Sequence, residues 1–166
     1  MVDSISKLRH YIISKHTFIL ESKTNGKQQH TIVHDHRGTF EVPTSSLQIV
    51  KNSCKAHGSH YDYSLAQSKK LLYHTQRHKL PIVVGSDYGK PLILFPLFSP
   101  DAKQNMWILF NNVLQCRTFD EISIVLTNNQ IIDLPIQENT LLRQISSSLI
   151  LEKLITNNWR DNQLYF

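Results

Sequence analysis

The stretch SSLQIVKNSCKAHGSHY (residues 45–61) sets the class of fold that the sequence predicts, because it places one helix between two groups of short strands. Ser45 and Ser46 are suitable N-terminal caps, and Gly58 is well placed to end the helix, so we predict a helix over residues 47–57. At about 100° per residue, one side of this helix carries the residues expected to face a core, which are Leu47, Val50, Cys54 and His57.

A second side of the predicted helix carries only cations and amides. Its residues are Gln48, Lys51, Asn52 and Lys55, which we call the lysine–amide face. Solvated helix faces usually mix charge signs, because opposite charges one turn apart stabilise a helix. Lysines suit phosphate groups and amides suit base edges, so this acid-free face favours nucleic acid as the partner.

Short apolar stretches on both sides of the helix predict strands. Upstream they are residues 17–21 and 30–34, joined by a turn at Asn25-Gly26, and residues 40–42. Downstream they are residues 71–75, 80–84, 91–96, 106–114, 122–126 and 130–134, the last two joined by a hairpin turn at Asn128-Asn129. Residues 61–70 fit either a loop or a short helix. This order of elements predicts an α+β fold with a mainly antiparallel sheet.

A C-terminal helix over about residues 140–156 is predicted next, with Asn139 as its cap. Its apolar side is broad and includes Leu142, Ile145 and Leu149, which is more than one sheet edge can cover. We therefore predict that this helix takes part in self-association. Residues 1–156 then form a single domain, and residues 157–166 form a short tail.

Composition restricts the class of protein. Of the 166 residues, 40% are hydrophobic and 19% are charged, which excludes a wholly disordered chain. No apolar run reaches the length of a membrane-spanning helix, and the first residues lack the pattern of a signal peptide. We therefore expect a cytoplasmic protein without a membrane partner, in which Cys54 and Cys116 are free thiols.

The net charge of +5 is concentrated in the middle of the chain. Residues 51–118 contain nine basic and three acidic residues, whereas residues 119–166 contain three basic and six acidic ones. A localised basic field favours a polyanionic partner, either nucleic acid or a membrane surface. A solvated basic surface that binds nothing in particular explains the charge alone equally well.

The spacing Cys54-x-x-His57-x-x-His60 is typical of metal ligands. A structural zinc site takes four ligands, usually as two close pairs. Cys116 or His74 is a candidate fourth ligand, but no second close pair appears. Cys54 also lies on the core-facing side of the helix, where a thiol is a poor nucleophile. The sequence has neither a phosphate-binding glycine loop nor a nucleophile elbow. We therefore predict no metal, no cofactor and no catalytic residue, and do not expect an enzyme.

Further residues extend the predicted nucleic-acid contact beyond the lysine–amide face. Hydroxyl groups and cations suit the nucleic-acid backbone, and tyrosine rings stack on bases. The residues are Ser59, Tyr61, Lys69, Lys70, Arg77 and Lys79.

The opening stretch also resembles the signature of the competence transcription factor (ComK) family. In that family a leucine-glutamine-isoleucine-valine run leads to a serine-cysteine pair, then to a glycine-serine pair and a tyrosine. Here these are residues 47–50, 53–54, 58–59 and 61. Further similar segments follow in the same order, namely HKLPIVV (78–84), ILFP (93–96), Trp107 and VLTNNQIIDLPI (125–136). The order and spacing agree over about residues 44–155.

The resemblance implies a cytoplasmic transcriptional activator of bacterial DNA-uptake genes. Members of the family bind AT-rich double-stranded DNA largely through the minor groove, as dimers that assemble further. The resemblance therefore implies a homo-oligomer, with RNA polymerase and a proteolytic adaptor as protein partners. The lysine–amide face fits this independently, because a narrow AT-rich minor groove attracts cationic side chains.

A second hypothesis stays open. Where the family carries a glycine-arginine-lysine cluster after the tyrosine, this chain has DYSLA, residues 62–66. A divergent paralogue would regulate a related activator by pairing with it, without binding DNA itself. A metal-binding module built on Cys54, His57 and His60 is the third and least favoured hypothesis.

Overall fold

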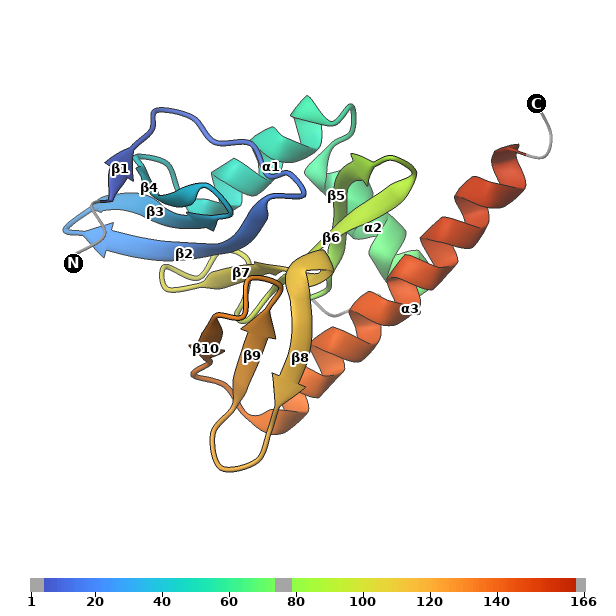
Figure 1. Ribbon diagram of the computed structural model, residues 1–166. Coiled ribbons are helices and arrows are strands. Elements are labelled where there is room, and N and C mark those ends of the chain that lie inside the picture. Colours follow the sequence, from blue (N-terminus) through green and yellow to red (C-terminus); the bar gives the residue numbers. More distant parts are fainter. Residues whose placement is uncertain (1–4, 74–78, 164–166) are drawn as a thin grey trace.

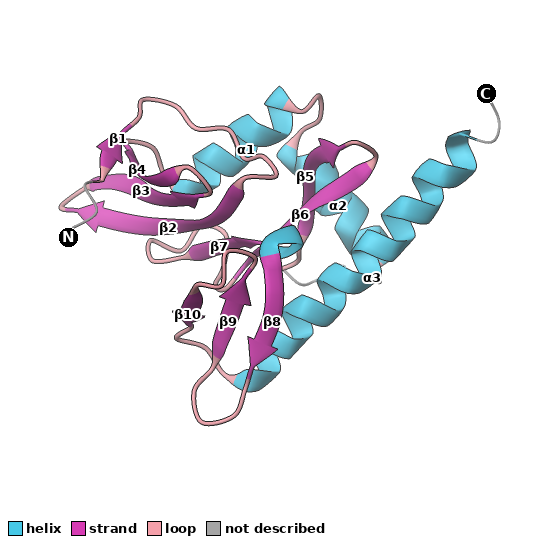
Figure 2. Cartoon of the chain, in the orientation of Figure 1, coloured by secondary structure: helices cyan, strands magenta, loops and turns pink. Residues whose placement is uncertain are grey.

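Two β-sheets and three α-helices make up the part of the chain that the structure describes, residues 5–73 and 79–163 (Figure 1). The structure is a computed structural model. The helices are α1 (Ser46–Ala56), α2 (Tyr61–Leu71) and α3 (Glu138–Gln163). Figure 2 shows these helices on the outside of the strands.

The large sheet has seven strands. They are β1 (Ser6–Lys7), β2 (Thr17–Asn25), β3 (Gln28–Asp35), β4 (Gly38–Val42), β5 (Ile82–Asp87), β6 (Lys90–Pro96) and β7 (Met106–Leu109). Their order across the sheet is β1-β4-β3-β2-β7-β6-β5, and every neighbouring pair except β1 and β4 is antiparallel. The predicted α+β class with a mainly antiparallel sheet is therefore confirmed.

The small sheet has three strands in the order β10-β9-β8, which are β8 (Val113–Arg117), β9 (Ser123–Leu126) and β10 (Ile131–Asp133). The prediction of one continuous strand over residues 106–114 is wrong, because the 3₁₀ turn η1 (Phe110–Asn112) separates β7 from β8. The side chain of Asn111 donates to the Pro91 carbonyl at 2.9 Å, and that of Asn112 donates to the Thr17 carbonyl at 2.7 Å. These two amides hold the turn at which the chain leaves one sheet for the other.

Both predicted hairpin turns are confirmed. Gly26 follows β2 with φ of 64°, a left-handed conformation that glycine adopts without strain. Asn129 takes φ of 67° between β9 and β10, and the Asn128 side chain accepts a hydrogen bond from the Gln130 N–H at 3.1 Å. The short polar side chain of asparagine is well suited to this position.

The two faces of the large sheet are covered by different elements. One face packs against α1, whose Ile49, Val50 and Cys54 join a core with Leu20 and Trp107 of the sheet. On the opposite face, β6 and β7 pack against the small sheet and α3. Helix α2 lies against the edge strand β5 and joins the core on both sides through Leu65. This arrangement leaves the outer surfaces of α1 and α3 on opposite sides of the molecule (Figure 1).

Two predictions about helices need correction. The strand predicted over residues 71–75 is wrong in its described part, because Leu71 is the last residue of α2 and Leu72 packs against the core from the helix end. The C-terminal helix begins at Glu138, so Asn139 lies inside its first turn, and it continues to Gln163 rather than ending near Thr156. Within the described residues, no helix combines the length and the apolar character needed to cross a membrane.

Candidate nucleic-acid interface

Helix α1 is fixed at both ends by local hydrogen bonds. The Ser45 side chain accepts a hydrogen bond from the Gln48 N–H at 3.2 Å, as predicted for an N-terminal cap. At the other end Gly58 takes φ of 85°, and its N–H donates to the Lys55 carbonyl at 3.0 Å. The Ser59 N–H donates to the Cys54 carbonyl at 2.9 Å, which closes the helix end.

Buried serines fix how α1 is rotated on the sheet. The Ser53 hydroxyl accepts a hydrogen bond from the Ile13 N–H at 3.0 Å and donates to the Ile49 carbonyl at 2.7 Å. The Ser46 hydroxyl accepts from the Ser22 hydroxyl of β2 at 2.7 Å. Because buried polar groups are costly without partners, these bonds favour one rotation of the helix.

The lysine–amide face points away from the sheet, as predicted, and all four of its side chains are exposed. The Gln48 side-chain amide donates to the Asn52 side-chain oxygen at 2.9 Å, so the two amides are hydrogen-bonded to each other along the helix. The Lys51 ammonium lies 5.9 Å from the ring centroid of Tyr61, a cation–π arrangement. In the part of the chain that the structure describes, neither Lys51 nor Lys55 pairs with a carboxylate. Both ammonium groups are therefore available to an anionic partner.

The remaining predicted contact residues are spread more widely. Ser59 is half-buried in the turn between α1 and α2, and Tyr61 begins α2 with its ring against the core. Burial raises the pKa of the Tyr61 hydroxyl to about 12, so it acts as a neutral hydrogen-bonding group. Lys69 and Lys70 lie in α2 roughly 12 Å along the axis from Tyr61, at 1.5 Å per residue.

Two predicted contacts lie near the boundary of the described residues. Lys79 is half-buried, and its carbonyl accepts a hydrogen bond from the Gln144 side chain at 2.9 Å. Arg77 lies outside the described residues. The assignment of these residues, and of those on α1 and α2, to a nucleic-acid contact stays a prediction.

Cys54, His57 and His60, which have the spacing of metal ligands, lie in three different environments. Cys54 is buried, and this burial raises the pKa of its thiol to about 11, which disfavours the thiolate that a metal requires. The His57 Nε2 atom lies 2.8 Å from the Ile13 carbonyl oxygen, and His60 is exposed before α2. Among the described residues, no three histidine, cysteine or acidic side chains are grouped as metal ligands.

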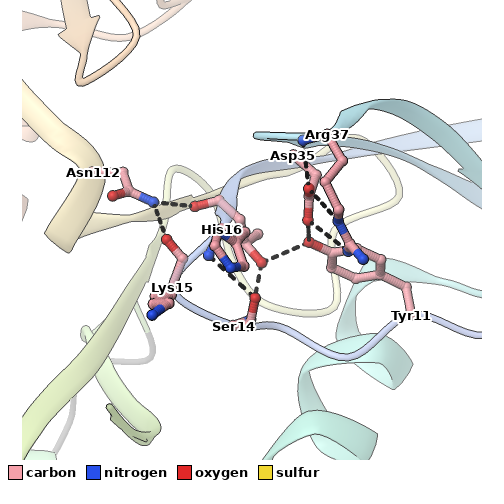
Figure 3. Close-up of polar contacts among 8 residues, drawn as sticks. Tyr11, Ser14, Lys15, His16, Asp35, Arg37 and Asn112 are labelled. Atoms are coloured by element: carbon pink, nitrogen blue, oxygen red, sulfur yellow. Dashed lines mark hydrogen bonds and ion pairs between the residues drawn. The ribbon is translucent and has the colours of Figure 1, made fainter. Parts of the chain in front are cut away.

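An ion pair between the exposed Arg37 and the buried Asp35, which the sequence did not reveal, holds the segment leading into β2 (Figure 3). The Asp35 carboxylate is fully buried and accepts hydrogen bonds from the Arg37 side chain at 2.9 Å and from the Tyr11 hydroxyl. Burial acts to raise the pKa of Asp35, but the bonds from Arg37 and Tyr11 outweigh it and lower that pKa. The sequence signal that could have indicated this ion pair is the spacing of Asp35 and Arg37, two residues apart at a tight turn.

The residues predicted for self-association occupy two environments on α3. Leu142 and Leu149 are 42% and 52% exposed, and Ile150 adds a third exposed apolar side chain at 52%. Ile145 instead packs against the core between α3 and the small sheet. Leu142 and Leu149 are therefore free to meet another molecule, whereas Ile145 is engaged within its own chain.

The fold and this surface together define an α+β domain that presents an exposed, acid-free cationic helix. The model of the ComK protein family matches residues 8–159, and the chain belongs to that family. A relative, the competence transcription factor of Bacillus subtilis (strain 168), is 33% identical over 110 residues. The match covers 64% of this chain and 54% of the relative, so the chain spans about half of the relative's length. No solved structure matches the chain.

Proposed function

We propose that this protein is a DNA-binding transcriptional activator of bacterial competence genes that recognises AT-rich duplex DNA through the minor groove. Its membership of the ComK family and its similarity to a competence transcription factor support the regulatory role. The exposed lysine–amide face of α1 is the single observation that supports DNA as the direct partner.

The lysine–amide face suits duplex DNA for two physical reasons. Lys51 and Lys55 carry charges that no carboxylate of the described residues neutralises. Both charges can therefore attract the phosphate groups of DNA at full strength. Gln48 and Asn52 present an amide donor and acceptor to groove edges or to backbone oxygens. Preference for AT-rich sequences follows from the narrow minor groove of such DNA, whose enhanced negative potential attracts cations.

A mobility-shift experiment with three duplexes tests this function. One duplex is AT-rich, one is GC-rich, and in the third inosine replaces every guanine. Inosine lacks the guanine amino group in the minor groove but keeps the major-groove edge of guanine. We expect the protein to bind the inosine duplex as it binds the AT-rich one, and to bind the GC-rich one more weakly. If the inosine duplex behaves like the GC-rich duplex, recognition through the minor groove is contradicted.

A regulatory partner that does not bind DNA is the second candidate function. The observation that favours it is Asp62, an exposed acid in the first turn of α2, at the point where the resemblance places a basic cluster. Such a protein would form mixed oligomers with a related activator and leave the AT-rich duplex unshifted even at low salt. Asp62→Asn separates the two cases, because removing this carboxylate strengthens a weak DNA contact but restores nothing where DNA binding is lost.

A further inference from the structure

The turn between β5 and β6 carries an aromatic residue in an unusual backbone conformation. Tyr88 and Gly89 are the two central residues of this hairpin turn, with φ of 46° and 78°. Such turns favour asparagine or glycine at both positions, because Cβ crowds the backbone where φ is positive; glycine has no Cβ, and the short polar side chain of asparagine bonds locally. The β2–β3 and β9–β10 hairpins have Gly26 and Asn129 in their left-handed positions. A tyrosine in this place is a local cost that calls for a functional reason.

The Tyr88 ring lies in solvent and next to cations. Its side chain is 95% exposed, the highest value among the large apolar and aromatic side chains of the described residues. The Lys15 ammonium lies 5.6 Å from the ring centroid and 4.0 Å from the Asp87 carboxylate, and Lys90 follows the turn directly. The tip therefore presents an aromatic ring with two lysines and one carboxylate.

His57 fastens this hairpin to the end of α1. A Cβ placed on Gly85 of β5 would lie 2.3 Å from the His57 ring carbon Cγ, so the ring occupies the space that a side chain at Gly85 would need. The same ring bonds through Nε2 to the Ile13 carbonyl, two residues before Lys15. The Lys15 carbonyl in turn accepts a hydrogen bond from the Asn112 side chain at 2.9 Å (Figure 3). His57 thus links β5 of this hairpin and the segment before β2 to the end of α1 that carries Lys55.

Tyr88 and Lys55 both lie a short distance along the backbone from the His57 joint. Tyr88 lies three strand residues beyond Gly85, or roughly 10 Å at 3.3 Å per residue. Lys55 lies two helical residues before His57, or roughly 3 Å along the axis. Measured along the backbone, both residues therefore lie within roughly 10 Å of the His57 joint, which is less than the major-groove width of B-DNA, about 12 Å.

We propose that the β5–β6 hairpin is a second DNA-contacting element, in which Tyr88 enters the minor groove beside the backbone contacted by α1. Lys15 and Lys90 then lie near the flanking phosphates, where their charges are favourable. Aromatic and apolar side chains that enter a minor groove gain contact with the exposed faces of partly unstacked bases. This inference rests on the proposed function, since it names a residue that reads the same DNA.

Tyr88→Asn tests the inference without endangering the fold. Asparagine followed by Gly89 is the most favoured pair for this turn, so we expect the melting temperature to stay the same or to rise. Affinity for the AT-rich and inosine duplexes should fall on the order of tenfold, as for the loss of one stacked aromatic. Affinity for the GC-rich duplex should change little, because its minor groove is blocked by guanine amino groups. Phe119→Asn, which removes another exposed aromatic ring in the loop between β8 and β9, is the matched control and should leave all three affinities unchanged.

The possible results separate the two proposals. Unchanged affinity of Tyr88→Asn for the AT-rich duplex overturns the inference and leaves the proposed function intact. An equal loss on the AT-rich and GC-rich duplexes also overturns it, because Tyr88 would then contact the backbone rather than the groove. If the wild-type protein binds none of the duplexes, the proposed function and this inference both fall.

Discussion

Helices α1 and α3 cover opposite faces of the same sheet with similar inner surfaces and with very different outer ones. Ile49 of α1 and Leu151 of α3 are both fully buried, and each belongs to an apolar core against the large sheet. The outer surface of α1 is the lysine–amide face, whereas the outer surface of α3 carries Leu142, Leu149 and Ile150 among polar residues.

The difference between the two outer surfaces indicates which kind of partner each helix is suited to bind. Covering exposed apolar surface with another apolar surface is favourable by about 25 cal/mol of free energy per Å² buried. Burying a face of lysines and amides brings no comparable gain in free energy, whereas binding an anion to it is favourable. We therefore expect α3 to meet protein and α1 to meet DNA, while the inner faces of both helices maintain the fold.

The largest expected effect is on the inner faces. Ile49→Ala and Leu151→Ala should each lower the free energy of unfolding by about 3 kcal/mol, because each leaves a cavity in a packed core. Urea denaturation measures both values. A loss below about 1 kcal/mol for either variant would mean that the helix concerned does not share the core as described.

The next effect concerns the segment leading into β2, whose Ile13 bonds to Ser53 of α1. Asp35→Asn should lower the free energy of unfolding by about 2 kcal/mol at neutral pH, since it weakens charged hydrogen bonds from Arg37 and Tyr11. The folded-state pKa of Asp35 is lowered, so its stabilisation is present above the unfolded pKa and is lost as the pH falls through the folded one. Stability measured from neutral to acid pH should therefore fall less steeply in Asp35→Asn than in the wild type. Parallel curves would contradict the role of this carboxylate.

A pair of lysine variants compares the outer faces directly. Lys51→Ala should weaken binding to all duplexes similarly and flatten the plot of log affinity against log salt by about one unit. Lys153→Ala removes an exposed lysine from α3 and should leave both the affinity and the slope unchanged. Titrations at several salt concentrations decide the matter, and equal effects of the two variants would remove the distinction between the faces.

The smallest effect on stability is expected from Leu149→Glu. This side chain is half-exposed on α3, so the free energy of unfolding should change by less than about 0.5 kcal/mol. The particle mass from light scattering should nevertheless fall, because a charge at an apolar contact between copies opposes association. Gln48→Glu on α1 serves as the control and should leave the mass unchanged. An unaltered mass of Leu149→Glu would reject the role of α3 in assembly.

Local signals explain why α1 was predictable from the sequence. Ser45, Gly58 and the apolar period between them act over a few residues, and they placed the helix and its exposed face correctly. The hairpin turns at Gly26 and Asn129 are equally local. The strand predicted over residues 71–75 was wrong, because packing of α2 against β5 decided the conformation of an apolar stretch that suits helix or strand.

Contacts between distant residues account for what the sequence did not reveal. The role of His57 depends on Ile13 and Gly85, which lie far from it in the chain. The role of Asn112 likewise depends on distant residues, because its side chain donates to the Lys15 and Thr17 carbonyls. These bonds hold the turn that interrupts the strand predicted over residues 106–114. Cys54 of the conspicuous cysteine and histidine spacing is thus packed in the core, and His57 bonds within the chain. The lysine–amide face beside them was recognisable because it contains no acid.

The salt dependence of binding to an AT-rich duplex shows whether the outer face of α1 contacts DNA. We expect about five of the six lysines on α1, on α2 and beside Tyr88 to contact phosphate. The slope of log affinity against log salt should then be about −4 or steeper. A slope near zero, or no binding at low salt, would contradict the assignment of the outer face of α1 to DNA.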